Sequence, residues 1–225
     1  MFNFGKSVNR VVIPELSEQA VLHSVKEAGR NYTEQEDYNL MESLDFYYNQ
    51  NLDNHIEPWF ASESLSQVPP FISSCVPRFA KARMMLYKTP PQRFIAGEQN
   101  ELYNDVTYRI NSKTREYAEL SWLLGKCYMK TRYNPRFNRL EYEVLPRVQE
   151  YYFHGETEPY GYSYEIESFE SNKKRFVFWS EDRDGVPGMH FEFDEKGKRH
   201  AIGGNPDMIN PYGLIPISKV EFSKG

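Results

Sequence analysis

Residues 101–147, ELYNDVTYRINSKTREYAELSWLLGKCYMKTRYNPRFNRLEYEVLPR, decide the fold of this chain. Their first half places apolar residues at helical spacing, which predicts a long amphipathic helix that ends at Gly125. After Gly125 the residues alternate in character on both sides of an Asn134-Pro135 turn, which predicts a β-hairpin. The stretch carries no catalytic pattern and is interpreted as a docking frame. The apolar stripe of its helix consists of Leu102, Val106, Ile110, Tyr117, Leu120 and Leu124.

Upstream of this frame the sequence predicts an extended arm and two helices. Residues 1–14 read as the arm, whose Val and Ile residues can pair with a strand. Ser17 can cap a helix that ends near Gly29, because a serine hydroxyl accepts a backbone N–H of the first turn. Thr33 and Glu36 fit a capping box, which predicts a second helix that ends in the turn-rich sequence NQNLDN.

A loop rich in proline and serine separates this region from the rest of the chain. The loop covers residues 51–70 and predicts a boundary between an N-terminal helical arm, residues 1–56, and a wing-like domain, residues 57–225. Because proline is tolerated only in the first turn of a helix, the next helix is predicted to begin near Pro77 and to stop before Pro90. A short strand or turn, FIAGE, then leads into the docking frame.

Downstream of the hairpin the sequence predicts one strand after another. Turn-forming residues separate alternating segments, which is typical of antiparallel strands. With helices first and an antiparallel sheet second, the predicted class is α+β. The predicted strands cover about residues 148–154, 160–169, 174–181 and 188–194, followed by a last extended segment at 214–222.

The composition limits the classes of function. The net charge of −5 argues against a broad basic face that would hold nucleic acid. The aromatic fraction of 16% fits either a β-rich fold or a large subunit interface, and both interpretations stay open. Cys75 and Cys127 match no metal or disulfide pattern and are predicted to be buried. No apolar run reaches the roughly 18 residues of a membrane span, so no membrane partner is predicted.

One strand carries the best local cluster of ionisable residues. His190, Glu192 and Asp194 would project from the same face of a strand, where they could bind a divalent metal. The favoured alternative is that they face water while the apolar residues between them face the core, since alternation alone explains the pattern. Residues 181–185, EDRDG, are assigned to a hairpin turn rather than to a calcium loop. No catalytic, cofactor-binding or metal residue is therefore assigned.

The hairpin has a basic and aromatic edge over residues 128–139. Such an edge could contact a phosphate backbone or stack on bases. Lys130 and Arg132 can instead pair across the strands with Glu141 and Glu143, and this second interpretation is favoured. The edge is therefore predicted to be a cross-strand and inter-subunit surface rather than a DNA site.

Taken in order, these elements resemble the N-terminal, wing-like half of the portal proteins of tailed bacteriophages. The resemblance spans most of residues 33–222 and depends on the order and spacing of short motifs. Pro77 departs from the family, which usually has a continuous helix there, and the family's stem, clip and crown lie beyond the matched segment. The motifs are Tyr47-Tyr48-Asn49, LYKTPPQRFI, Leu124-Gly125, VQEYYF and Asn210-Pro211-Tyr212-Gly213-Leu214-Ile215-Pro216.

The resemblance implies a structural virion protein that is assembled in the host cytoplasm. Portal proteins form a ring, usually of twelve subunits, at one capsid vertex, where DNA passes, the terminase docks and head and tail join. The implied partners are further copies of the chain, the major capsid protein, the scaffold, the terminase and tail adaptors, with double-stranded DNA passing non-specifically. No enzyme activity and no cofactor are implied. Two alternatives stay open: a metal-dependent hydrolase or nuclease that uses His190, Glu192 and Asp194, and a head–tail adaptor without a DNA channel.

Overall fold

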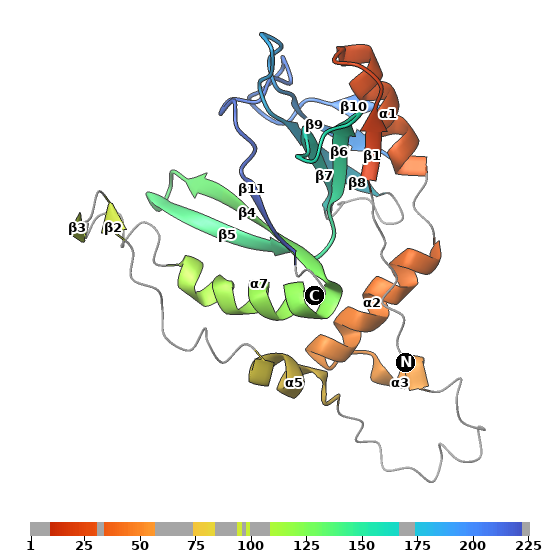
Figure 1. Ribbon diagram of the computed structural model, residues 1–225, viewed down its shortest axis with the longest axis vertical. Helices are drawn as coiled ribbons and strands as arrows, with labels where there is room; N and C mark the ends of the chain where they lie inside the picture. The colour runs from red at the N-terminus through yellow and green to blue at the C-terminus, as the bar shows by residue number, and fades with distance from the viewer. Residues whose placement is uncertain are drawn as a thin grey trace.

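Figure 1 shows the computed structural model, in which a group of helices and a strand-rich region lie side by side. The described part of the chain contains a six-stranded sheet, a three-stranded sheet and a small two-stranded sheet, together with short and medium-length helices. This arrangement confirms the predicted α+β class. The structure describes residues 10–30, 34–56, 74–83, 94–95, 98–99, 109–166 and 174–221.

The helices begin and end largely where the sequence predicts. The Ala20 N–H donates to Ser17 Oγ at 3.2 Å, which confirms the predicted cap, and Pro77 lies in the first turn of its helix. One prediction is wrong, because residues 52–56, at the end of the predicted turn cluster and in the predicted loop 51–70, form a short helix. The capping box at Thr33 and the stripe residues before position 109 lie outside the described residues. The helices are α1 Glu18–Arg30, α2 Glu34–Tyr48, α3 Leu52–Ile56, α5 Val76–Arg83 and α7 Ile110–Leu124.

Each of the strand segments predicted downstream of the hairpin contains an observed strand. The six-stranded sheet has the order β1-β6-β7-β8-β9-β10, and the three-stranded sheet has the order β11-β4-β5. The strands are β1 Arg10–Ile13, β2 Phe94–Ile95, β3 Glu98–Gln99, β4 Lys126–Asn134, β5 Arg139–Leu145, β6 Gln149–Phe153, β7 Gly161–Ile166, β8 Arg175–Ser180, β9 His190–Asp194, β10 Arg199–His200 and β11 Ile217–Glu221.

The described part of the predicted arm belongs to the six-stranded sheet. This part, β1, pairs with β6, which confirms that the arm can add to a strand. This pairing is parallel, whereas the other strand pairs of the described residues are antiparallel. Parallel pairing requires a long connection, and the intervening chain supplies it with the helices. The predicted domain boundary at residue 56 stays a prediction, although β1 and β6 pair across it.

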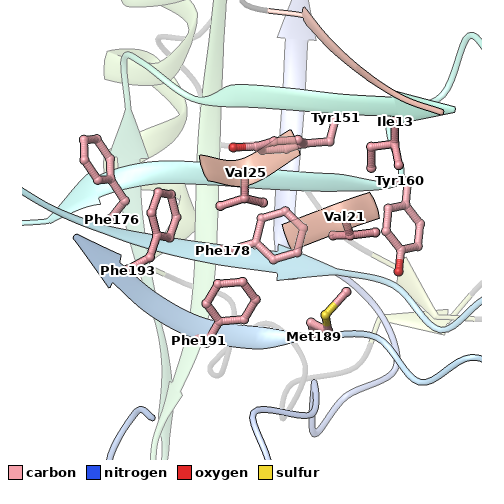
Figure 2. Close-up of a cluster of buried hydrophobic side chains, with 10 residues drawn as sticks. All are labelled: Ile13, Val21, Val25, Tyr151, Tyr160, Phe176, Phe178, Met189, Phe191 and Phe193. Carbon is pink, nitrogen blue, oxygen red and sulfur yellow. The ribbon is translucent and has the colours of Figure 1, made fainter. Parts of the chain in front are cut away.

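The first core lies between α1 and one face of the six-stranded sheet (Figure 2). Val21 and Val25 of α1 are only 1% and 2% exposed, and they lie over the aromatic residues of β8 and β9. Burying each valine stabilises the fold by roughly 1.5 kcal/mol. Phe178 and Phe191 pack with tilted rings, 5.2 Å between centroids, in the middle of this layer. The aromatic residues therefore serve a β-rich core here, as one of the two interpretations of the composition requires.

Two further layers complete the molecule. The opposite face of the six-stranded sheet, with Tyr162 and Trp179, packs against Tyr128 of the three-stranded sheet. The far face of the three-stranded sheet, including Cys127, packs on α7 through residues such as Leu120. The order of layers is α1, six-stranded sheet, three-stranded sheet and α7, as the stacking in Figure 1 shows. The docking frame is therefore the outer half of this stack.

Candidate functional site

The helix and hairpin of the docking frame are joined as predicted. Gly125 follows the last residue of α7 with φ 83, a left-handed conformation that favours glycine, and the chain turns directly into β4. β4 pairs with β5 in antiparallel register, with Lys130 opposite Glu143 and Arg132 opposite Glu141. β11 pairs with the other edge of β4 over residues 126–130, so β4 is the central strand of this sheet and β5 is an edge strand. The base of the hairpin is therefore paired on both edges of β4, and the side chains farther along project from β4 and β5 alone.

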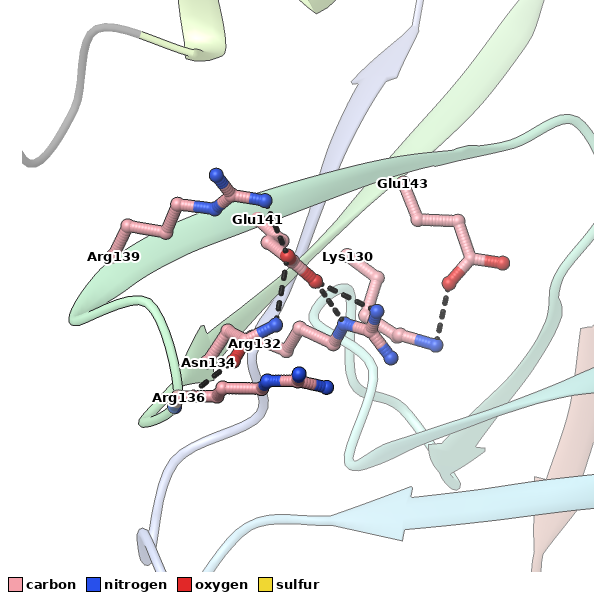
Figure 3. A network of polar contacts seen from close by, with 7 residues as sticks. All are labelled: Lys130, Arg132, Asn134, Arg136, Arg139, Glu141 and Glu143. Carbon is pink, nitrogen blue, oxygen red and sulfur yellow. Dashed lines mark hydrogen bonds and ion pairs between the residues drawn. The ribbon is translucent and has the colours of Figure 1, made fainter.

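Ion pairs cross the hairpin on one face (Figure 3). Lys130 Nζ lies 2.6 Å from Glu143 Oε2, and an Arg132 guanidinium nitrogen lies 2.6 Å from Glu141 Oε2. The other oxygen, Glu141 Oε1, accepts hydrogen bonds from Asn134 at 2.8 Å and from Arg139 at 3.2 Å. Hydrogen bonds from Asn134 and then Arg132 hold the pKa of Glu141 below its ordinary value. The predicted cross-strand pairing is therefore confirmed.

The far end of the hairpin, residues 133–139, is called the hairpin tip. Tyr133 and Phe137 are 51% and 54% exposed there, a large fraction for aromatic side chains. The guanidinium carbon of Arg139 lies 4.5 Å from the centre of the Phe137 ring, and that of Arg136 lies 5.5 Å from it. The Tyr133 hydroxyl donates to Asn138 Oδ1 at 2.6 Å. Exposed aromatic and arginine side chains in fixed positions are typical of protein interfaces.

A shallow groove of about 450 Å³ runs beside β5 and the start of α7. Three basic and two acidic side chains line it, so its lining carries charges of both signs. Such a mixed lining suits the polar surface of another protein better than the uniform negative charge of a nucleic-acid backbone. Its lining residues are Arg109, Lys113, Arg132, Glu141, Tyr142 and Glu143.

The junction of the two large sheets contains a buried carboxylate, Glu150 of β6. Its oxygens lie 3.2 Å from Lys126 Nζ of β4 and 3.0 Å from Lys219 Nζ of β11. Although burial opposes the charged form, these two ammonium groups keep the pKa of Glu150 below its ordinary value. Burial, and then this carboxylate, raise the pKa of Tyr128 and Tyr162, whose hydroxyls stay protonated. Sequence reasoning missed this cluster, because three strands distant in sequence supply it.

The Tyr47-Tyr48-Asn49 motif joins α2 to other helices. The Tyr47 and Tyr48 hydroxyls donate to Glu119 and Glu116 of α7 at 2.5 and 3.0 Å. Burial, and then contact with these carboxylates, raise the pKa of both tyrosines far above the ordinary value. Asn49 ends α2 in the left-handed region, with φ 58, and its Oδ1 accepts a backbone N–H just before α5 at 2.8 Å. Each residue of the motif therefore has a structural role.

The segment from Asn210 to Pro216 forms a loop that is held by its own side chains. Asn210 is 4% exposed, and its Nδ2 donates to the carbonyls of Ser180 at 2.7 Å and Leu214 at 3.0 Å. Gly213 has φ 65, and a Cβ placed there would lie 2.8 Å from Asp182 Oδ2. The asparagine and the glycine of this motif are thus required by the geometry of the loop.

The structure gives separate surroundings to the three residues of the metal hypothesis. His190 stacks on Trp179 with 3.4 Å between ring centroids, and burial, followed by the charge of Lys130, lowers its pKa to about 4. Asp194 Oδ1 accepts two backbone N–H groups of the next turn, each at 2.9 Å. Glu192 is half-buried on β9 between them. Within the described ranges no three His, Cys, Asp or Glu side chains gather closely enough to hold a metal ion.

The alternation predicted for β9 is confirmed on the core side. Phe191 and Phe193 are buried against α1. The opposite side differs from the prediction, because His190 does not face open water but packs between the two sheets on Trp179. The EDRDG segment forms the predicted turn, since Arg183 pairs with Val186 around two residues of positive φ.

The two cysteines lie in different environments. Cys127 is fully buried, as predicted, and burial raises the pKa of its thiol to about 12. Its Sγ–H group donates to the Leu145 carbonyl at 3.4 Å, so it acts as a small core residue. Cys75 is exposed, and the prediction that it is buried is wrong. It lies just before α5 and not on the helical face from which its burial was predicted.

Comparison with known proteins adds no family to these observations. No family model and no curated protein matches this chain. Among the described residues, no helix has both the length and the apolar character needed to cross a bilayer.

Proposed function

We propose that this chain is a structural virion protein, the wing-like part of a phage portal that forms a ring at one capsid vertex. The observation that carries the proposal is the structural role of the motifs that resemble the portal family. Asn49 ends α2, Gly125 ends α7, and Asn210 holds the loop before β11. A shared architecture would require residues that fix the turns between elements. The structural roles of these motif residues therefore support the resemblance more strongly than the short motif sequences do by themselves.

The surface of the docking frame also supports an assembly role. Its hairpin is anchored at its base by β11, carries exposed aromatic and arginine side chains, and has a groove of mixed charge beside it. A ring needs heterologous contacts, in which two different patches meet on neighbouring copies. The overall charge of −5 fits a channel through which DNA slides, because contact with an acidic surface releases few counterions and the affinity for DNA is therefore low. In this proposal the partners are further copies, capsid protein, scaffold, terminase, tail adaptors and passing DNA.

The proposal is tested by the oligomeric state of the purified chain. Sedimentation velocity over a series of protein concentrations, together with negative-stain electron microscopy, is expected to show ring-shaped oligomers of uniform size. A chain that stays monomeric at every concentration contradicts the proposal. Compact oligomers without a central opening would instead favour a head–tail adaptor.

A further inference from the structure

The hairpin tip and its base carry an excess of positive charge. Arg132, Arg136 and Arg139 contribute three positive charges, and Glu141 is the single carboxylate that Arg132 and Arg139 share. The net charge of these four side chains is therefore +2. Phe137 contacts the guanidinium groups of Arg136 and Arg139 and is 54% exposed. The tip thus combines an apolar centre with a basic rim.

A second surface carries the opposite charge at one end of the six-stranded sheet. The loop after β8 contains Glu181, Asp182 and Asp184 around Arg183, which also forms an ion pair with Glu156 at 2.7 Å. The hydrogen bond from Arg183 to Glu156, and the charges of Glu181 and Asp184, raise the pKa of Arg183. Four carboxylates and one guanidinium group give a net charge of −3.

Exposed apolar side chains adjoin these acids. Tyr212 and Leu214 are 61% and 72% exposed, among the highest values for large apolar residues in the described ranges. The Asp182 N–H donates to the Gly213 carbonyl at 3.0 Å, which places the loop that carries them directly beside the acidic residues. Glu156, residues 181–184, Tyr212 and Leu214 are together called the acidic loop end.

We propose that the hairpin tip of one copy docks on the acidic loop end of a second copy of this chain. The apolar centre of one surface meets exposed apolar side chains on the other, and a basic rim meets an acidic one. In Figure 1 the β4–β5 turn ends apart from the loops that follow β8 and β10, so the contact requires another molecule. The inference rests on the proposed function, because it names the contact by which copies of the chain associate.

The contact is tested by cysteine cross-linking in the full chain with Cys75→Ser. A variant with both Phe137→Cys and Leu214→Cys is oxidised with copper–phenanthroline and run on a non-reducing gel. The expected result is a ladder of disulfide-linked multimers. The matched control replaces Phe137→Cys by Phe79→Cys, since Phe79 on α5 is 62% exposed and lies outside the proposed contact. This control is expected to lose the ladder.

Charge reversal provides a second test that does not depend on disulfides. Arg136→Glu and Asp184→Arg each replace attraction by repulsion, and each is expected to weaken association about tenfold in sedimentation equilibrium. The chain with both changes is expected to recover most of the association. Raising the salt concentration is expected to weaken the wild-type contact, because exposed charges are screened.

The outcomes separate this inference from the proposed function. A ladder supports both, whereas cross-linked dimers alone support the contact and contradict a ring. Wild-type rings without any cross-link between positions 137 and 214 overturn the contact and leave the proposed function standing. A wild-type chain that never associates overturns both. If Arg136→Glu abolishes binding of a DNA duplex and leaves self-association unchanged, the tip is a nucleic-acid site and the inference is overturned.

Discussion

Replacing Glu150 by Gln is predicted to destabilise the fold strongly, because the carboxylate joins the two large sheets. Its side chain is 3% exposed, whereas those of Lys126 and Lys219 are 21% and 24% exposed. The change leaves two ammonium groups without their shared anion, and removing one partner of a buried ion pair costs about 3–5 kcal/mol. Because both lysines keep some contact with water, we expect a loss near the lower end, about 3 kcal/mol.

The assay is urea unfolding followed by tryptophan fluorescence. With a slope of about 3 kcal/mol per molar urea for a chain of this size, the midpoint is expected to fall by about 1 M. Glu143→Gln is the matched control, since it removes a hairpin ion pair whose carboxylate side chain is 56% exposed. Because the Glu143 carboxylate stays in contact with water, although Lys130 is only 15% exposed, losing this pair is expected to cost less, roughly 1 kcal/mol.

Two results would refute this reasoning. A midpoint shift for Glu150→Gln that is no larger than that for Glu143→Gln shows that the buried cluster does not hold the sheets together. Adding Lys126→Met and Lys219→Met to Glu150→Gln is expected to restore much of the loss, because apolar replacement of a whole ion cluster is often neutral. A further fall in stability contradicts that explanation. Since the folded-state pKa of Glu150 is lowered, the wild-type advantage is expected to shrink as the pH falls below the ordinary glutamate pKa.

Three further predictions concern the loop and the sheet junction. Gly213→Ala is expected to lower the unfolding free energy by about 2 kcal/mol, because of left-handed backbone strain and the close approach to Asp182. The control Gly203→Ala has open space around its Cβ and is expected to change the unfolding free energy by less than about 0.5 kcal/mol. Equal losses for the two variants in urea unfolding contradict this prediction. Asn210→Ala removes the amide that donates to two carbonyls and is expected to lower the unfolding free energy by about 2–4 kcal/mol, measured as a fall in the urea midpoint. A loss under about 1 kcal/mol contradicts the role of these two hydrogen bonds in holding the loop. Because the pKa of His190 is lowered to about 4 by burial and then by Lys130, the unfolded chain takes up a proton first as the pH falls from about 6.5, so wild-type stability drops by about 2 kcal/mol by about pH 4. His190→Phe is expected to reduce that drop, and an unchanged pH profile shows that another group causes it.

Local patterns in the sequence predicted much of the fold. Alternation around Asn134-Pro135 was sufficient for the hairpin and for its cross-strand ion pairs, because residues on one face of paired strands must meet once the turn is fixed. Gly125 marked the end of α7 for the same local reason, since few other residues adopt a positive φ. Asn210 was recognised as part of a motif, although its bonds to Ser180 and Leu214 were not foreseen.

Only the tertiary structure decided which faces meet. Glu150 reads in the sequence as a polar residue in an apolar strand, and β4 and β11 make it the centre of a charge cluster. His190 has the spacing of a solvent-facing residue, yet the three-stranded sheet covers that face and lowers its pKa. The sequence by itself determined the elements and their two faces, because period and turn chemistry are local. The contacts between layers depend on residues far apart in the chain, which no local pattern encodes, so the structure alone placed the hairpin tip and the acidic loop end on separate surfaces.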